Sequence, residues 1–189
     1  MTMPQAVVLG CSAGGLTALE TVLAQLDPAL SQALIVCCHT GSSDVDMFCE
    51  LLALHSTLPV VEAAERQPVQ AGVVHVAPSG YHLLVETSHR FSLSVDPRVC
   101  YSRPAIDVLF ASAAAAYRDR LIGVLMTGAN HDGASGLAEI RRLGGIAIVQ
   151  DPQDAEVPSM PQAALDLAGA DHCVPLQAIG PLLNHLCRP

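Results

Sequence analysis

The chain has 189 residues, of which 51% are hydrophobic and 14% charged, so it can bury a sizeable core and falls within the usual size range of one domain. A net charge of -9 and a pI near 5.1 argue against nucleic-acid partners, whose binding depends on clustered basic residues. No apolar run of about 18 residues and no signal-peptide pattern is present, so we expect a cytoplasmic protein without membrane insertion.

Short aliphatic runs recur along the chain, with helical stretches between them. The runs at 6–9, 33–38, 121–126 and 146–149 are typical of strands buried on both faces. Their alternation with helices predicts an α/β fold: a doubly wound, mostly parallel sheet with helices on both faces. We expect one domain over residues 1–189.

The first helix follows the first run directly. Its leucines recur at helical spacing and Pro28 ends the pattern. These leucines are Leu16, Leu19, Leu23 and Leu26. The order is therefore strand, glycine turn, helix.

The middle of the chain has a different pattern. Segments 74–77, 83–86 and 91–95 are short and partly alternating, with Pro-Ser-Gly and Thr-Ser-His turns between them. We therefore expect an antiparallel hairpin at one edge of the sheet.

Two more helices are expected after this hairpin. Pro104 suits the first turn of an alanine-rich helix that runs to about Tyr117. A second helix begins near Asp132 and ends at the glycine pair Gly144 and Gly145.

The cysteines are seven, an odd number, and none has CxxC spacing. This pattern favours reduced, mostly buried thiols over a zinc site or a disulfide framework. The positions are Cys11, Cys37, Cys38, Cys49, Cys100, Cys173 and Cys187.

The glycine turn after the first strand, residues 10–15, reads Gly-Cys-Ser-Ala-Gly-Gly and satisfies G-x-S-x-G. Ser12 in such a turn lifts its hydroxyl above the sheet edge, and the helix N-terminus offers amides to developing negative charge. Two other interpretations stay open: a dinucleotide-binding turn, or a serine that only caps the helix. The dinucleotide pattern requires a glycine at position 12 and an acidic residue after the second strand, where this chain has His39.

His39 and Asp132 follow two other predicted strands. Taken singly, such a histidine is most often a packed or surface residue, and such an aspartate is most often the N-cap of its helix. Parallel strands, however, bring both side chains and Ser12 to the same carboxyl edge, where open α/β sheets place their sites. Since a carboxylate can orient an imidazole that accepts a serine proton, we interpret the three residues as a candidate catalytic triad.

Several other residues carry reactive or metal-binding side chains. His131 is an alternative base, but neighbours at a helix start point in different directions. Cys11 is an alternative nucleophile whose side chain should point away from the apex of the turn. Three histidines recur every seven residues, and in strands this odd spacing alternates faces, which argues against a metal site. They are His75, His82 and His89.

Together these motifs resemble the catalytic domain of CheB, the protein-glutamate methylesterase of bacterial chemotaxis. The family's serine turn, its histidine after the second strand and its Thr-Gly-x-x-x-Asp-Gly-Ala-x-Gly segment are similar to residues 10–15, His39 and residues 127–136. Further similar segments are 76–83, 103–110 and 150–161. The resemblance therefore covers nearly the whole chain.

The resemblance implies a serine hydrolase that demethylates glutamyl methyl esters on the cytoplasmic helices of methyl-accepting chemotaxis receptors, releases methanol, and can also deamidate receptor glutamines. It assigns Ser12 as nucleophile, His39 as base and Asp132 as the residue that orients the base, without a metal or organic cofactor. The chain order Ser, His, Asp differs from the Ser, Asp, His order of α/β-hydrolases. The oxyanion and substrate region of the family corresponds to Ala13, Thr127, Gly128 and Ala129.

The chain also departs from the family pattern. Ala13 stands where the family often has threonine, Ala129 where it often has methionine, and Asn130 where it usually has glycine. A catalytically weak or silent adaptor in a chemosensory pathway therefore stays open as an alternative function.

A second departure concerns regulation. Family members usually carry an N-terminal receiver domain, whereas this chain starts at the hydrolase strand. We expect a stand-alone domain. Three options then remain: constitutive activity, control by a separate regulatory protein, or a sequence taken from a longer protein.

Overall fold

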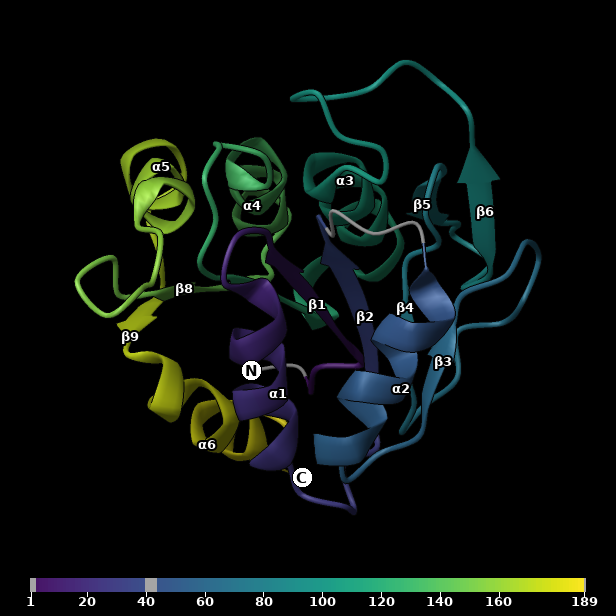
Figure 1. Cartoon of the computed structure of the whole chain (residues 1–189), viewed down its shortest axis with the longest axis horizontal. Helices are drawn as coiled ribbons and strands as arrows, with labels where there is room; N and C mark the ends of the chain where they lie inside the picture. Colours follow the sequence, from purple (N-terminus) through teal and green to yellow (C-terminus); the bar gives the residue numbers. More distant parts are fainter. Residues whose placement is uncertain (1–2, 40–43, 189) are drawn as a thin grey trace.

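The computed structural model describes residues 3–39 and 44–188, and its centre is a parallel sheet (Figure 1). In this part of the chain seven strands pair in the order β3-β4-β2-β1-β7-β8-β9, and every pair is parallel. The strands are β1 (Ala6–Cys11), β2 (Ala33–Cys38), β3 (Val60–Glu62), β4 (Val74–Val76), β7 (Leu121–Leu125), β8 (Ile146–Gln150) and β9 (His172–Val174). Strand β1 pairs with β2 on one side and with β7 on the other, so the strand order changes direction at β1.

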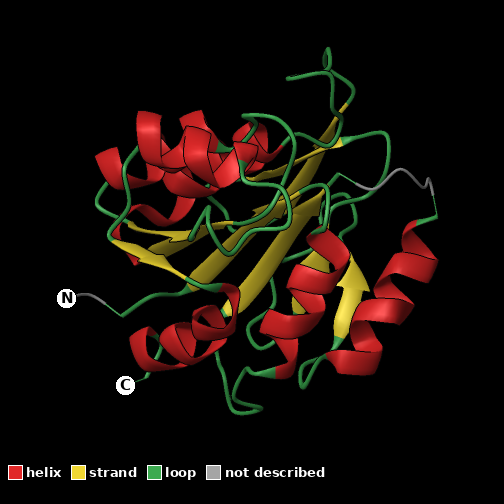
Figure 2. Cartoon of the chain, turned by 60° about the vertical axis from the view of Figure 1, so that its left-hand side comes forward, coloured by secondary structure: helices red, strands yellow, loops and turns green. Residues whose placement is uncertain are grey.

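Helices cover both faces of this sheet, as Figures 1 and 2 show. One layer holds α1 (Gly15–Ala24), α2 (Val45–His55) and α6 (Leu176–Leu186), and the other holds α3 (Ile106–Tyr117), α4 (Ala134–Arg142) and α5 (Ser159–Leu167). A short 3₁₀ turn, Arg118–Arg120, follows α3. Each layer has its own apolar core, and the fold predicted from the alternating runs is confirmed.

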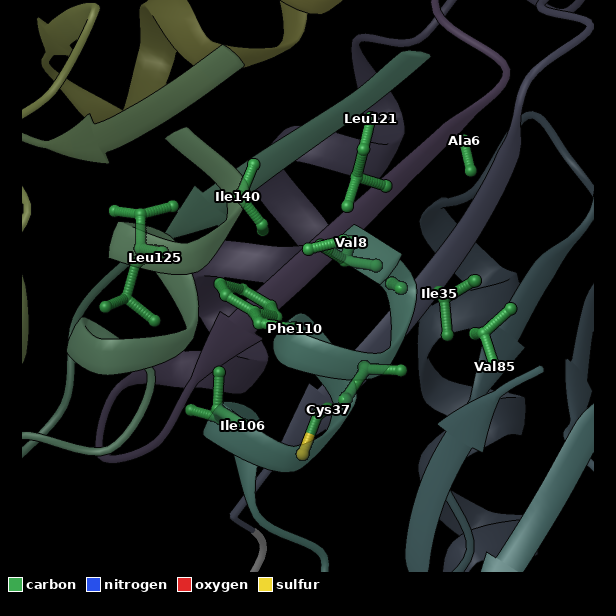
Figure 3. Close-up of a cluster of buried hydrophobic side chains, with 14 of the residues drawn as sticks. Ala6, Val8, Ile35, Cys37, Val85, Ile106, Phe110, Leu121, Leu125 and Ile140 are labelled. Atoms are coloured by element: carbon green, nitrogen blue, oxygen red, sulfur yellow. The ribbon is translucent and has the colours of Figure 1, made fainter. Parts of the chain in front are cut away.

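Two strand glycines let the α3 and α4 helices approach the sheet closely. A Cβ added at Gly10 would lie 2.5 Å from Ile106 Cγ2, and one at Gly123 would lie 2.5 Å from Ile140 Cδ1. Both isoleucines belong to the core cluster drawn in Figure 3. Because packed cores tolerate extra atoms poorly, these contacts fix how closely the first turn of α3 and the last turn of α4 lie against the sheet.

The middle segments differ in one respect from their predicted arrangement. The hairpin exists, since β5 (His82–Val85) and β6 (Phe91–Ser94) pair antiparallel, but it forms a separate two-stranded sheet. The segment predicted at 74–77 is β4, which pairs parallel with β2 and β3 inside the main sheet. His75 gives this segment its alternating appearance, but the histidine is itself buried, with its ring edge-on to Phe91.

The helix bounds differ slightly from the predicted ones. Pro104 lies two residues before α3 rather than in its first turn. The α4 helix begins at Ala134, and its N-cap is Gly133 rather than Asp132. The Asp132 carboxylate therefore does not cap α4 and can contact other groups.

Tyr117, at the end of α3, gives a test of this core. Its side chain is 4% exposed, its ring stacks on His89 at a centroid distance of 4.4 Å, and burial raises the pKa of its hydroxyl to about 12. The unfolded chain loses this proton near the ordinary tyrosine value of about 10. The stabilising contribution is therefore complete below about pH 10 and is lost as the pH rises towards the folded pKa. We expect Tyr117→Phe to unfold in urea with a weaker pH dependence than wild type between about pH 10 and about pH 12. Tyr101→Phe is the control, because Tyr101 is 94% exposed, and equal slopes for all three proteins would contradict the prediction.

Candidate active site

The three residues predicted to act together leave neighbouring strands at the same sheet edge. Cys11 pairs with Cys38 in the β1–β2 register, so Ser12 and His39 follow at the same level. The His39 amide donates to the Cys11 carbonyl over 3.1 Å. Asp132 comes from the loop after β7, which pairs with the other side of β1. The parallel sheet thus brings the predicted residues to one place.

The Ser12 turn is held by its backbone. Its amide donates to the Thr127 carbonyl over 2.9 Å, and its carbonyl accepts from the Gly15 amide over 2.8 Å. Gly14 caps α1 in the left-handed region with φ 76°, and no side chain caps this helix. The interpretation of Ser12 as a helix cap is therefore wrong. Among the described residues, the amides of Ala13 and Gly14 have no acceptor.

His39 and Asp132 form a short, shielded pair. His39 Nε2 lies 2.8 Å from Asp132 Oδ2, and the two side chains are 12% and 0% exposed. An ionised carboxylate only accepts, so Nε2 carries the proton and Nδ1 is left as the basic nitrogen. Nδ1 lies 3.4 Å from the hydroxyl of Ser102, a residue that the sequence motifs did not single out.

Asp132 also caps a helix, but not the one that follows it. Its Oδ2 accepts from the Ile106 amide over 2.7 Å, and its Oδ1 accepts from the Asp107 amide over 2.9 Å. Both amides belong to the first turn of α3, whose positive end stabilises a nearby negative charge. The same carboxylate therefore caps the N-terminus of α3 and accepts the hydrogen bond from His39.

Asp107 repeats this arrangement in the opposite direction. Its Oδ1 accepts from the amides of Gly133 and Gly136, over 3.0 and 2.7 Å, at the start of α4. Burial raises the pKa of the Asp107 carboxyl, and so does the charge of Asp132, against the lowering effect of the two amide hydrogen bonds. The two helices thus cap each other through aspartates, a link between distant segments that no local sequence pattern signals.

The residues predicted for the oxyanion and substrate region divide into two groups. Thr127 Oγ1 donates to the Ala13 carbonyl and accepts from the Val157 amide, each over 2.9 Å. The Gly128 amide donates to the Val157 carbonyl over 3.1 Å. Both residues are buried and fasten the Ser12 turn to the loop before α5, whereas Ala13 and Ala129 are exposed.

The alternative nucleophile and base lie elsewhere. Cys11 is fully buried, and its pKa is raised well above the ordinary thiol value by a hydrogen bond with Cys38 and by burial. His131 is exposed, and its Nε2 lies 3.4 Å from Cys100 Sγ. Neither residue lines the cavity that holds Ser12.

The remaining histidines and cysteines carry separate contacts. His82 forms a hydrogen bond with the Pro97 carbonyl. His75 packs against the ring of Phe91, and His89 stacks on the ring of Tyr117. The seven cysteines are free thiols, of which four are buried.

A cavity of about 400 Å³ opens beside Ser12 and His39. Its walls are apolar on the α1 and α2 side, where Leu16, Met47, Phe48 and Leu51 lie. They also carry two carboxyls, from Asp44 before α2 and from Glu156 in the loop before α5. A smaller cavity of about 130 Å³ lies on the other side of His39, next to Ser102. None of the helices within residues 3–39 and 44–188 has the length and apolarity that crossing a bilayer requires.

Fold and site together define a class: a doubly wound α/β protein that brings a turn serine and a histidine–aspartate pair to the carboxyl edge of its sheet. The sequence profile of CheB methylesterase matches residues 7–183. A protein of Leptospira interrogans is 41% identical over 182 residues, which cover 96% of this chain and 94% of that one. The chain belongs to the CheB methylesterase family.

Further comparisons agree with this assignment. The protein-glutamate methylesterase/protein-glutamine glutaminase of Symbiobacterium thermophilum is 37% identical over 92% of this chain, and the protein-glutamate methylesterase FrzG of Myxococcus xanthus is 36% identical over 94%. The chain spans about half of these two relatives, 48% and 53% of their lengths. The CheB methylesterase catalytic domain of Thermotoga maritima superimposes with a TM-score of 0.92 at 28% identity, over 98% of this chain and 100% of that one.

Proposed function

We propose that this chain is a serine hydrolase that demethylates glutamyl methyl esters on chemoreceptor helices and releases methanol. The observation that carries the proposal is the shielded His39–Asp132 pair, which leaves Nδ1 as a base beside the cavity that Ser12 lines. The names of the relatives supply the substrate class. The predicted roles of nucleophile for Ser12, base for His39 and orienting residue for Asp132 are kept as part of this proposal.

The reaction follows acyl-transfer logic. His39 Nδ1 takes the proton of Ser12 Oγ while this oxygen attacks the ester carbonyl, and the Asp132 carboxylate stabilises the imidazolium that forms. The tetrahedral intermediate collapses as His39 gives its proton to the methoxide, so methanol leaves and an acyl-serine remains. Water, deprotonated by the same nitrogen, then releases the glutamate side chain and restores Ser12.

The backbone amides nearest to Ser12 supply the oxyanion contacts in this proposal. The amide of the residue after the nucleophile is the usual donor of a serine elbow, and here it belongs to Ala13, whose amide has no acceptor among the described residues. The Gly128 amide is already used, so the second donor comes from Gly14 or from the exposed Ala129. The alanine at position 13 does not remove a backbone donor.

The cavity walls fit an ester better than its product. The apolar side chains of Leu16, Met47 and Phe48 can contact the methylene groups and the methyl of a glutamyl ester. Glu156 lies at the same cavity, with its carboxyl against Gly14, where it disfavours the negatively charged glutamate product. This charge arrangement favours product release.

Methanol release tests the proposed substrate. Receptor-containing membranes from the source organism, methylated with a labelled methyl donor, should release labelled methanol when the protein is added, and unmethylated membranes should release none. Ammonia release from receptors that carry glutamines at the same positions tests the deamidase activity named for the relatives. If the protein hydrolyses a simple aryl ester but releases no methanol, it is an esterase whose substrate is not a receptor methyl ester. The absence of both activities would favour the silent adaptor.

A further inference from the structure

Three side chains with metal-binding atoms, including Asp132, lie close together, and a fourth contacts one of them. Cys100 Sγ lies 3.4 Å from His131 Nε2. Cys100 Sγ and one carboxylate oxygen each of Asp107 and Asp132 all lie within 4.8 Å of one another. The four residues come from three places: the loop before α3, the first turn of α3 and the loop before α4. The proposed hydrolysis uses only Asp132 among them.

One distance, that between Cys100 and His131, is close to the distance between two ligands of a tetrahedral zinc ion. Zinc binds thiolate at about 2.3 Å and imidazole at about 2.0 Å, which places the sulfur and nitrogen about 3.5 Å apart. Cys100 and His131 already have this separation. Cys100 Sγ and the two carboxylate oxygens lie within 4.8 Å of one another, and His131 is not part of that group, so binding requires Cys100 and His131 to move towards the carboxylates. Cys100 is partly exposed in a loop, and His131 is exposed.

The chemistry of the donors narrows the choice of ion. One sulfur, one imidazole nitrogen and carboxylate oxygens suit Zn²⁺ and its transition-metal neighbours, whereas Mg²⁺ and Ca²⁺ prefer oxygen alone. Among the described residues, neither Asp107 nor Asp132 forms an ion pair with an arginine. The two carboxylates therefore repel each other without a fixed cation between them, and a divalent ion would relieve this repulsion.

We propose that Cys100, His131, Asp107 and Asp132 form a site for a divalent transition-metal ion of the Zn²⁺ class, and that the bound ion inhibits hydrolysis. Inhibition follows because a metal on the Asp132 carboxylate competes with the hydrogen bond that orients His39. This second half rests on the proposed function. The first half, metal binding, does not.

Binding is measured with Co²⁺ and Zn²⁺ on the full chain. We expect Co²⁺ to give a thiolate charge-transfer band in the near ultraviolet, and an equivalent amount of Zn²⁺ to displace it. Cys100→Ser should abolish the band, and His131→Gln should weaken Zn²⁺ binding by more than about tenfold, the lower bound seen even for residues that only support metal ligands. Cys173→Ser and His172→Gln are matched controls on β9, because Cys173 is an exposed thiol outside the cluster. A band that survives Cys100→Ser, or disappears in Cys173→Ser, overturns the site.

Inhibition is measured separately by methanol release against free Zn²⁺. We expect Zn²⁺ to inhibit wild type and Cys173→Ser, a chelator to restore both, and Cys100→Ser to keep its own metal-free rate. Equal inhibition of all three proteins would overturn the regulatory half. If the metal-free protein releases no methanol, the proposed function fails, while the Co²⁺ titration still decides whether the metal site exists.

Discussion

Ser12→Ala should reduce methanol release by about 10⁶-fold, the size of effect found when the nucleophile of a serine hydrolase is removed. The remaining rate would come from the cavity and the backbone amides alone. Folding should be unaffected, because the contacts that hold the Ser12 turn are made by its backbone, so the free energy of unfolding should change by less than about 0.5 kcal/mol. The measurements are the initial rate of methanol release and urea unfolding of the same preparation.

Ser102 provides the matched control for this result. Its hydroxyl is the one that lies 3.4 Å from His39 Nδ1, so geometry alone makes it a rival for the proton transfer. We expect Ser102→Ala to lower the rate by about tenfold or less, as for a residue that contacts the base without reacting. A fluorophosphonate should label Ser12 in wild type and in Ser102→Ala, as located by peptide mass spectrometry. A labelled Ser102, or full activity in Ser12→Ala, would exclude Ser12 as the nucleophile.

The sheet and the meeting of Ser12, His39 and Asp132 could be predicted because both depend on short patterns. Aliphatic runs buried on both faces predict parallel strands, and parallel strands place their following loops at one edge. The segment around His75 is predicted only as short and partly alternating, because one polar residue in a three-residue strand imitates alternation. Burial of that histidine by the rest of the fold overrides the pattern.

The contacts that complete the site could not be predicted, because they join residues that are distant in the sequence. Asp132 accepts from amides 26 and 25 positions away, and Asp107 returns the same type of contact to Gly133 and Gly136. Single-sequence patterns describe neighbours along the chain, whereas these bonds depend on how α3 packs against α4. Gly136 shows the dependence, since a Cβ there would lie 2.5 Å from the Cβ of Phe110. Ser102 was missed for the same reason.

Asp132→Asn should lower kcat by about 10⁴-fold, the size of effect seen when the orienting carboxylate of a triad becomes an amide. The amide nitrogen and His39 Nε2 cannot both donate, so the imidazole would turn or change tautomer and lose its basic Nδ1. The same change should also destabilise the protein. Both Asp132 oxygens accept hydrogen bonds, from Ile106, Asp107 and His39, and an amide offers only one acceptor. Leaving a buried donor unpaired costs about 1–3 kcal/mol, which urea unfolding would detect.

Asp107→Asn separates the catalytic effect from the structural one. Asp107 uses a single oxygen for both amides of α4, so an asparagine can keep these hydrogen bonds through its carbonyl oxygen. The substitution also removes the negative charge of Asp107 beside Asp132. Burial raises the pKa of the Asp107 carboxyl and so disfavours this charge, which limits what its removal costs. We therefore expect Asp107→Asn to unfold within about 1 kcal/mol of wild type and to retain most of its kcat. If Asp132→Asn lost stability but kept its kcat within about tenfold, the aspartate would be only the cap of α3, and the base would need another partner.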